Sequence, residues 1–169
     1  LVAQGKPSAA MDVILRTNPQ PGITGSICEH PCTERCVRNF YDAPLAIREI
    51  KRFAYEHGPV APERAGAPNG VKVAIVGAGP AGLCAAYYLA QMGFEPIVYE
   101  AKKKLGGMVT GVIPGYRLTA QTVDGDLERL RQLGVRFELG KAIGKDVTLE
   151  RLRRDHAHVL LATGAQLGK

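Results

Sequence analysis

Apolar and polar residues alternate after position 71 in a way that predicts strands separated by helices. Residues 71–76 form a mostly apolar run typical of a buried strand, and a Gly-rich turn, an Ala-rich helix ending near Met92 and a second strand over 96–100 follow it. The pattern then predicts a helix over 119–133, a strand over 135–139, a short helix from Leu149 and a strand over 158–162. Strands that alternate with helices predict an α/β fold with a parallel sheet.

The N-terminal third has a different pattern, because its apolar positions are spaced as in helices. Residues 9–16 predict a short helix that ends before Pro19, since the residue preceding a proline is disfavoured in the helical region. Residues 21–39 are rich in Gly, Pro and Cys without a sustained period, so an irregular loop is expected there. A second helix is expected to open at Asp42 and to end at Gly58. Its apolar side, which must pack on something, consists of Leu45, Ile47, Ile50, Phe53 and Ala54.

A change of composition separates these two patterns. Residues 58–70 contain three glycines and three prolines in thirteen positions, which is typical of a linker. The chain therefore divides into a partial helical, cysteine-containing domain over 1–57, a linker over 58–70 and an α/β domain over 71–169. Because the chain lacks an initiator methionine and stops just beyond a strand-like run, we expect it to be an excised fragment.

Composition and charge exclude several classes of function. Hydrophobic residues make up 46% of the chain, yet no apolar run approaches the ~18 residues of a membrane span, and no signal peptide is present, so a cytoplasmic location is expected. The net charge of +6 is local: it is concentrated at residues 102–104 and at Arg151, Arg153 and Arg154. With only 6% aromatic residues, these runs are interpreted as solvated surface, and no nucleic-acid partner is expected.

The strongest motif is a Gly-x-Gly-x-x-Gly turn between the first strand and its helix. Gly77 permits the tight turn, Gly79 lets the backbone approach a pyrophosphate, and Gly82 lets helix and strand pack closely. The helix N-terminus presents unpaired N–H groups and positive dipole to phosphates. Glu100, at the end of the second strand, would accept hydrogen bonds from the adenosine ribose and would repel a 2′-phosphate, which disfavours NADP in this site. The alternative interpretation is a tight βα turn that binds nothing.

The succession of motifs resembles the small subunit of bacterial NADPH-dependent glutamate synthase, together with regions of dihydropyrimidine dehydrogenase and bifurcating ferredoxin:NADP oxidoreductases. The resemblance covers nearly the whole chain. It is carried, in order, by NPQPGITGSICEHPCTERC, APLAIREIKRFA, VAIVGAGPAG, LGGMVTGVIPGYRL, LGVRFELGKAIGKDVTLERL and VLLATGA. It implies that residues 71–169 are the N-terminal portion of a Rossmann-like FAD-binding domain and that residues 1–57 are a partial iron–sulfur domain.

The same resemblance implies which residues hold FAD. The Gly-rich turn and Glu100 would bind its AMP half, residues 106–108 would line the flavin, Ile143 would meet the adenine, and residues 163–164 would close over the pyrophosphate. The full set is Gly77, Ala78, Gly79, Pro80, Ala81, Gly82, Glu100, Ala101, Lys102, Gly106, Gly107, Met108, Ile113, Pro114, Arg117, Ile143, Thr163 and Gly164. Gly111 and Val112 stand where the family usually has Tyr-Gly, so the detailed flavin contacts of this loop are not carried over from the family.

Three cysteines, Cys28, Cys32 and Cys36, lie in the expected loop, and three loop thiols favour metal or cluster ligation over disulfides. The resemblance implies that they ligate 4Fe-4S clusters together with upstream cysteines that this chain does not contain. Lys51 stands where family members can supply a Glu or Gln oxygen, and a protonated lysine has no lone pair to donate. Two alternatives to cluster ligation stay open: a zinc ion held by these cysteines and His30, and free thiols. A fourth cysteine at position 84, among alanines, is interpreted as core packing.

No residue stands out as an acid–base catalyst, which suits a flavin enzyme because the cofactor carries its chemistry. The resemblance implies a parent oxidoreductase that passes electrons between NAD(P)H, FAD and iron–sulfur centres. A partner subunit or domain would accept the electrons, and NAD(P)H would bind in a domain that this chain does not contain, so the chain alone should be inactive. Two alternatives stay open: an NAD-dependent dehydrogenase domain, and a zinc-stapled, non-catalytic interaction module.

Overall fold

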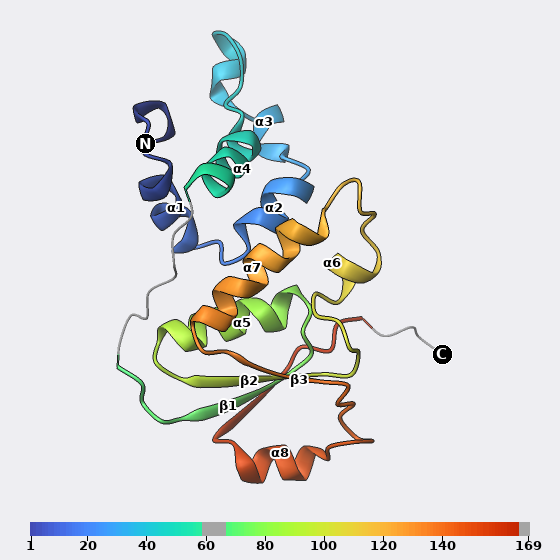
Figure 1. Ribbon diagram of the computed structural model, residues 1–169. Coiled ribbons are helices and arrows are strands. Elements are labelled where there is room, and N and C mark those ends of the chain that lie inside the picture. Colours follow the sequence, from blue (N-terminus) through green and yellow to red (C-terminus); the bar gives the residue numbers. More distant parts are fainter. Residues whose placement is uncertain (59–66, 166–169) are drawn as a thin grey trace. The chain divides into compact units, whose positions relative to one another are not determined.

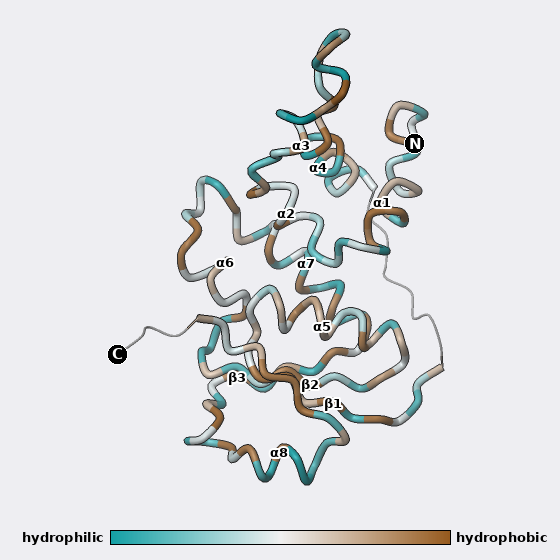
Figure 2. Tube along the Cα trace, turned by 180° about the vertical axis from the view of Figure 1, so that it is seen from behind, coloured by the Kyte–Doolittle hydropathy of each residue, from teal (hydrophilic) through white to brown (hydrophobic). Residues whose placement is uncertain are grey.

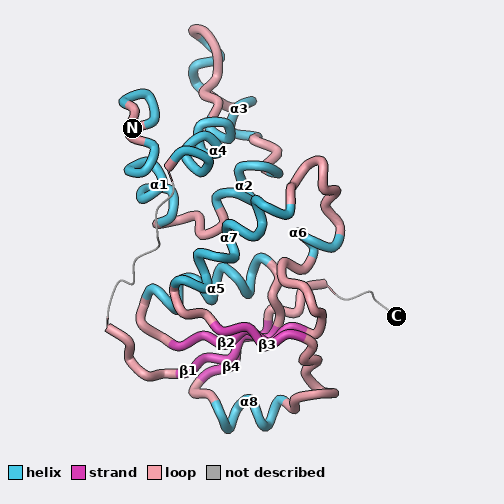
Figure 3. The backbone as a smooth tube through the Cα atoms, in the orientation of Figure 1, coloured by secondary structure: helices cyan, strands magenta, loops and turns pink. Residues whose placement is uncertain are grey.

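The computed structural model describes residues 1–58 and 67–165 (Figures 1 and 3). The helices are η1 (Val2–Gln4), α1 (Pro7–Leu15), α2 (Pro21–Ile27), α3 (Pro31–Glu34), η2 (Val37–Phe40), α4 (Ile47–His57), α5 (Pro80–Gln91), α6 (Met108–Gly111), α7 (Ala120–Gln132) and α8 (Leu149–Asp155). The strands are β1 (Lys72–Val76), β2 (Glu95–Glu100), β3 (Arg136–Leu139) and β4 (His158–Leu161). Two compact units result: the N-terminal unit, from the described part of Leu1–Ala61 and Pro114–Asp126, and the sheet unit, from the described parts of Pro62–Ile113 and Leu127–Lys169.

The sheet unit contains four parallel strands in the order β3-β2-β1-β4. β1 lies between β2 and β4, and their register pairs Val76 with Tyr99 on one side and with Leu161 on the other. Because all four strands are parallel, their carboxyl ends lie at the same edge of the sheet. This arrangement confirms the predicted α/β fold with a Rossmann-like sheet.

Helices cover both faces of this sheet, α5 on one and α8 on the other (Figure 1). Ala74 and Val76 pack with Leu152 of α8 in one buried cluster. Ile75 points to the opposite face, because successive side chains of a strand alternate, and there it lies beside Gly82 of α5. β1 is therefore buried on both sides, which explains the apolar run that predicted it, and Figure 2 shows the central strands as brown, hydrophobic segments.

The N-terminal unit is built on a small apolar cluster contributed by α1 and α4. Its buried members are Ala10, Met11, Leu15 and Ala54. The segment Pro114–Asp126 also belongs to this unit, since the Tyr55 hydroxyl donates to the Thr122 carbonyl oxygen at 3.1 Å. The predicted domain limits, which place all of 71–169 in one domain, differ from the two compact units by this segment.

Asp126 completes the same unit with a buried polar contact. Its side chain is only 1% exposed. Its two carboxylate oxygens accept hydrogen bonds from the backbone N–H groups of Gly22, at 3.3 Å, and Ile23, at 2.8 Å, in the first turn of α2. A carboxylate at a helix N-terminus satisfies N–H groups that have no partner within the helix. Residues more than a hundred positions apart in the sequence are joined in this way.

The expectation of an irregular loop over residues 21–39 is wrong, because α2, α3 and η2 occupy most of it. Pro21 and Pro31 each open a helix, a position in which the missing N–H of proline costs nothing. Gly25 of α2 then lies close to the α4 backbone, where a side chain would come within 3.4 Å of the Arg52 Cα atom. These helices are too short for a period of apolar residues to reveal them.

The second predicted helix begins later than expected. It starts at Ile47 instead of Asp42, whose carboxylate forms an ion pair with Arg38, while Gly58 follows its last residue as predicted. Only Ala54 of the predicted apolar side is buried; among the others Ile50 is 42% exposed and Ile47 is 47% exposed. Within the described residues the predicted apolar side is therefore buried only at Ala54, which packs in the cluster with α1.

Part of the predicted linker, residues 59–66, lies outside the described residues, as do residues 166–169. Within the part of the chain that the structure describes, no helix is long and apolar enough to cross a membrane.

Candidate functional site

Gly77 and Gly82 have the conformation and the close packing that the sequence predicts for them. Gly77 adopts φ = +108°, a left-handed conformation that strains any residue with a side chain. Gly82 packs so closely that a side-chain Cβ atom there would lie 2.0 Å from the Gly77 carbonyl oxygen. These two glycines therefore bring the end of β1 and the start of α5 into direct contact.

Gly79 leaves space at the N-terminus of α5. This twelve-residue helix begins with Gly79 as its N-cap, and no side chain caps it. A Cβ atom at Gly79 would meet no described atom within 4 Å. Unpaired N–H groups of a first helical turn, facing open space, form a site that attracts an anion such as a pyrophosphate. Pro80 and Ala81 are exposed at this end of the helix.

Glu100 contacts the same turn from the end of β2. One of its carboxylate oxygens accepts a hydrogen bond from the Ala78 N–H, and the other accepts one from the Lys102 N–H, both at 2.9 Å. The carboxylate thus ties the Gly-rich turn to the loop after β2, a structural role that the sequence did not predict. Because a carboxylate can accept about four hydrogen bonds, capacity remains for ribose hydroxyls.

The later part of the same loop after β2, residues 105–107, also contacts the turn. The Gly106 N–H donates to the Ala78 carbonyl oxygen at 2.9 Å, and the Thr110 hydroxyl donates to the Leu105 carbonyl oxygen at 2.7 Å. A side chain at Gly107 would come within 2.9 Å of the Gly79 Cα atom. The structure therefore brings this predicted flavin loop beside the Gly-rich turn, with Met108 67% exposed.

Of the remaining predicted FAD residues of the sheet unit, one lies beside the turn, and the others are described by their conformation, packing or exposure. Thr163 follows β4, and its Cα atom lies 3.3 Å from where a Gly77 side chain would begin. Gly164 comes next in the chain, with a positive φ of +72°. Ile143 packs against the core cluster around Leu152. Ala101 is exposed just beyond Glu100, and Ile113 is half-buried at the end of the flavin loop.

The predicted residues Pro114 and Arg117 belong to the N-terminal unit. The Pro114 carbonyl oxygen accepts a hydrogen bond from the Arg117 N–H at 3.0 Å, which forms a turn. The Arg117 guanidinium donates to Glu29 at 2.8 Å, and this hydrogen bond holds the pKa of the Glu29 carboxyl below its ordinary value. Arg117 therefore contacts residues 28–36, which contain the three cysteines and which we call the cysteine segment.

The three cysteines lie on three consecutive short elements: Cys28 follows α2, Cys32 lies within α3 and Cys36 precedes η2. All are free thiols. His30 has a φ of +43°, the one positive value among the described non-glycine residues, and its N–H donates to the Cys28 sulfur at 3.4 Å. An N–H directed at a sulfur, in strained backbone, is typical of sites that stabilise a thiolate.

These cysteines alone do not make a metal site. Over residues 1–58 and 67–165, no group of three or more His, Cys, Asp or Glu side chains is arranged to hold a metal ion. Thiolates are the ordinary ligands of iron–sulfur clusters, so the donor chemistry fits, but the described residues supply an incomplete set. The zinc alternative, which needs His30 as a fourth ligand, finds no support in this geometry. Burial raises the pKa of the Cys84 thiol, as expected for a packed cysteine.

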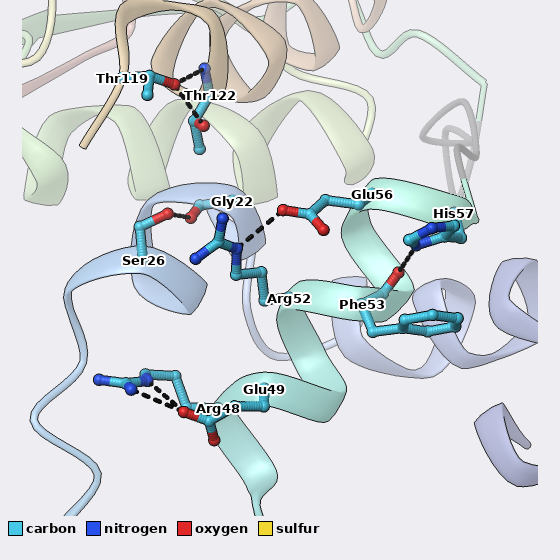
Figure 4. A network of polar contacts seen from close by, with 10 residues as sticks. All are labelled: Gly22, Ser26, Arg48, Glu49, Arg52, Phe53, Glu56, His57, Thr119 and Thr122. Carbon is cyan, nitrogen blue, oxygen red and sulfur yellow. Dashed lines mark hydrogen bonds and ion pairs between the residues drawn. The ribbon is translucent and has the colours of Figure 1, made fainter. Parts of the chain in front are cut away.

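Polar contacts lie along α4, the helix beside the cysteine segment (Figure 4). Arg48 pairs with Glu49 at 2.7 Å and also donates to the Cys28 carbonyl oxygen at 3.2 Å. Arg52 pairs with Glu56 at 2.8 Å. Exposed pairs of this kind contribute little to stability, so their main effect here is to position side chains. The contact between Arg48 and Cys28 was missed from the sequence, because it joins a side chain to a backbone carbonyl.

Two family models match different parts of the chain. Residues 1–60 match the family described as dihydropyrimidine dehydrogenase domain II, 4Fe-4S cluster, and residues 75–140 match the family described as NAD(P)-binding Rossmann-like domain. The NADP(+)-dependent formate dehydrogenase subunit beta of Moorella thermoacetica is 37% identical over 96% of this chain and 27% of its own length. The NADPH-Fe(3+) oxidoreductase subunit beta of Geobacter sulfurreducens is 39% identical over 95% of this chain and 25% of its own length.

Another relative and a solved structure complete these comparisons. The glutamate synthase [NADPH] small chain of Bacillus subtilis is 36% identical over 98% of this chain and 34% of its own length. Histamine dehydrogenase from Rhizobium sp. 4-9 superposes with a TM-score of 0.51 and 31% identity over 64% of this chain and 17% of its own. The chain thus spans only about a quarter to a third of the three curated relatives. It belongs to the oxidoreductase family that includes the glutamate synthase small chain, and it corresponds to their 4Fe-4S-type helical region followed by a Rossmann-like region.

Proposed function

We propose that this chain is the FAD-binding segment of an NAD(P)H-dependent iron–sulfur oxidoreductase. The observation that carries the proposal is the open N-terminus of α5, where Gly79 leaves space and Glu100 holds the turn. The N–H groups of the first turn of α5 would bind the pyrophosphate. Glu100 would accept hydrogen bonds from the ribose hydroxyls, and residues 106–108 would lie along the flavin ring. Bound FAD would supply the two-electron chemistry, and the protein would supply its position.

Gly79→Ala tests this proposal without disturbing the fold. A methyl group at Gly79 would meet no described atom within 4 Å, and the φ of −76° suits alanine. The same methyl group would occupy the space expected for the pyrophosphate. We therefore expect the wild-type chain to bind one FAD, seen by quenching of flavin fluorescence, and Gly79→Ala to lose at least about tenfold in affinity.

Gly115→Ala is the matched control, because this glycine also has open space around it but lies far from the turn in sequence. It should bind FAD like the wild type. Equal FAD affinity in all three proteins would contradict the proposed site. Tighter binding of NAD than of FAD would favour the dehydrogenase alternative.

The N-terminal unit would supply part of an iron–sulfur ligand set through Cys28, Cys32 and Cys36. The match of residues 1–60 to a 4Fe-4S family and the His30 N–H directed at Cys28 support this role. Since a 4Fe-4S cluster takes four ligands, anaerobic reconstitution should yield fewer than two clusters per chain by iron and sulfide analysis. Two full clusters would show that the ligand set is wrong. A partner subunit or domain would accept the electrons, as the names of the subunit relatives suggest.

A further inference from the structure

Five exposed lysines gather on two loops of the sheet unit, and we call them the lysine rim. They are Lys102, Lys103, Lys104, Lys141 and Lys145. The first three follow β2 and the other two follow β3, so both loops leave carboxyl ends of neighbouring strands. The Lys141 N–H donates to the Glu100 carbonyl oxygen at 2.9 Å, and the Gly140 N–H donates to the Lys102 carbonyl oxygen at 3.1 Å. These bonds hold the two loops together.

The rim is not neutralised by its surroundings. Among the described residues, none of the five lysines takes part in an ion pair, whereas seven arginines of the chain do. The two acidic residues closest in sequence, Glu100 and Asp146, both accept hydrogen bonds from backbone N–H groups of the same loops. Five positive and two negative charges leave this edge with a net positive charge.

The rim lies beside the dinucleotide site. Glu100 joins the Ala78 N–H of the Gly-rich turn to the Lys102 N–H of the rim through its two carboxylate oxygens. In open α/β sheets the carboxyl edge is where ligands enter. A dinucleotide arrives there with two phosphate charges, while the lysine side chains are flexible point charges in solvent that attract it over a distance.

We infer that the lysine rim captures the diphosphate of an incoming dinucleotide and steers it to the N-terminus of α5. The inference rests on the proposed function, in which that dinucleotide is FAD. Steering of this kind raises association rates by about 10- to 1,000-fold, and salt abolishes it because the Debye length falls from about 30 Å at 0.01 M to about 3 Å at 1 M. The rim therefore controls how fast the cofactor binds, and the turn controls how tightly.

A triple variant that removes three positive charges of the rim tests this inference. Its substitutions are Lys103→Gln, Lys104→Gln and Lys141→Gln. Its control is Arg151→Gln, Arg153→Gln and Arg154→Gln on α8, which removes the same net charge from exposed positions outside both loops. Stopped-flow mixing with FAD at 0.02 M salt should give an association rate about tenfold lower for the lysine variant and unchanged within about twofold for the arginine variant. At 1 M salt all three proteins should associate at the same rate.

Three results would overturn the inference: equal association rates for the two triple variants at low salt, a difference that persists at 1 M salt, or a change confined to the dissociation rate. Loss of poly-L-glutamate binding in the lysine variant, with FAD kinetics unchanged, would assign the rim to an acidic protein instead. If the wild type binds no FAD, the proposed function fails, and the same comparison with NADH and NADPH tests the rim. Binding of none of the three would overturn both.

Discussion

The two compact units carry candidate sites of opposite kinds. In the sheet unit the site is made from backbone: N–H groups of a helix start, glycines that allow close approach, and one carboxylate that holds the turn. In the N-terminal unit the candidate site depends on three cysteine side chains. Among the described residues, no three potential metal ligands come together at one point. A backbone site is complete once its strand, turn and helix fold, whereas a side-chain site also needs every ligand to be brought to one point. The comparison predicts that the sheet unit binds its cofactor without further protein, and that the N-terminal unit does not.

The largest expected effect concerns chemistry that neither unit should perform alone. The chain has one Gly-x-Gly-x-x-Gly turn, and FAD would occupy it. Holding a nicotinamide against the flavin is worth on the order of 7 to 11 kcal/mol of barrier, and the sequence has no second Gly-x-Gly-x-x-Gly turn to hold it there. We expect NADPH to reduce the FAD-loaded chain no faster than it reduces free FAD, measured by anaerobic stopped-flow bleaching. Bleaching at rates clearly above free FAD would place a nicotinamide site in these residues.

The next effect separates the two functions of the Gly-rich turn. Gly82→Ala would place a methyl group 2.0 Å from the Gly77 carbonyl oxygen, so helix and strand must move apart. Overpacking of this kind costs on the order of 3 kcal/mol. Urea denaturation should show this loss for Gly82→Ala and no loss for Gly79→Ala, whose methyl group faces open space. Equal stability of the two variants would mean that the close packing of the turn is unimportant.

Asp126→Asn should weaken the N-terminal unit selectively. The substitution removes a buried carboxylate that accepts from the Gly22 and Ile23 N–H groups, at a cost of roughly 1.5 to 3 kcal/mol. Hydrogen exchange of the α2 amides should rise more than exchange in β1, since the strand lies in the other unit. Asp124→Asn, an exposed neighbour on the same helix, is the control and should change neither. Uniform loss of protection in both units would show that they unfold together.

The two units also differ in how much of them the sequence predicts. Strands β1 to β4 and helices α5, α7 and α8 were predicted, because apolar runs and a Gly-rich turn leave clear periods, whereas the four-residue α6 was not. The helices over 21–40 were missed, since elements of four to seven residues are too short to show a period of apolar positions. Gly77 and Gly82 were assigned correctly to the tight turn and the close packing, whereas the hydrogen bond from the Ala78 N–H to Glu100 was not foreseen. The contact of Asp126 with the Gly22 N–H could not be predicted, because it joins residues far apart in the sequence and no nearby sequence pattern indicates it.

The smallest expected effect is the pH dependence of the ion pair between Glu29 and Arg117. The hydrogen bond from Arg117 lowers the pKa of Glu29 below its ordinary value of 4.5, so the folded state favours the charged carboxylate. The pair therefore contributes its stability above pH 4.5 and loses it as the pH falls through the lowered folded pKa. Both side chains are well exposed, at 48% and 81%, so solvent screens the pair and the contribution is small. Glu29→Gln should leave the melting temperature at pH 7 unchanged, while an NMR titration of the wild-type Glu29 carboxyl should give a midpoint below 4.5 that rises toward 4.5 in Arg117→Gln. A midpoint at the ordinary value in the wild type would show that Arg117 does not contact the cysteine segment in solution.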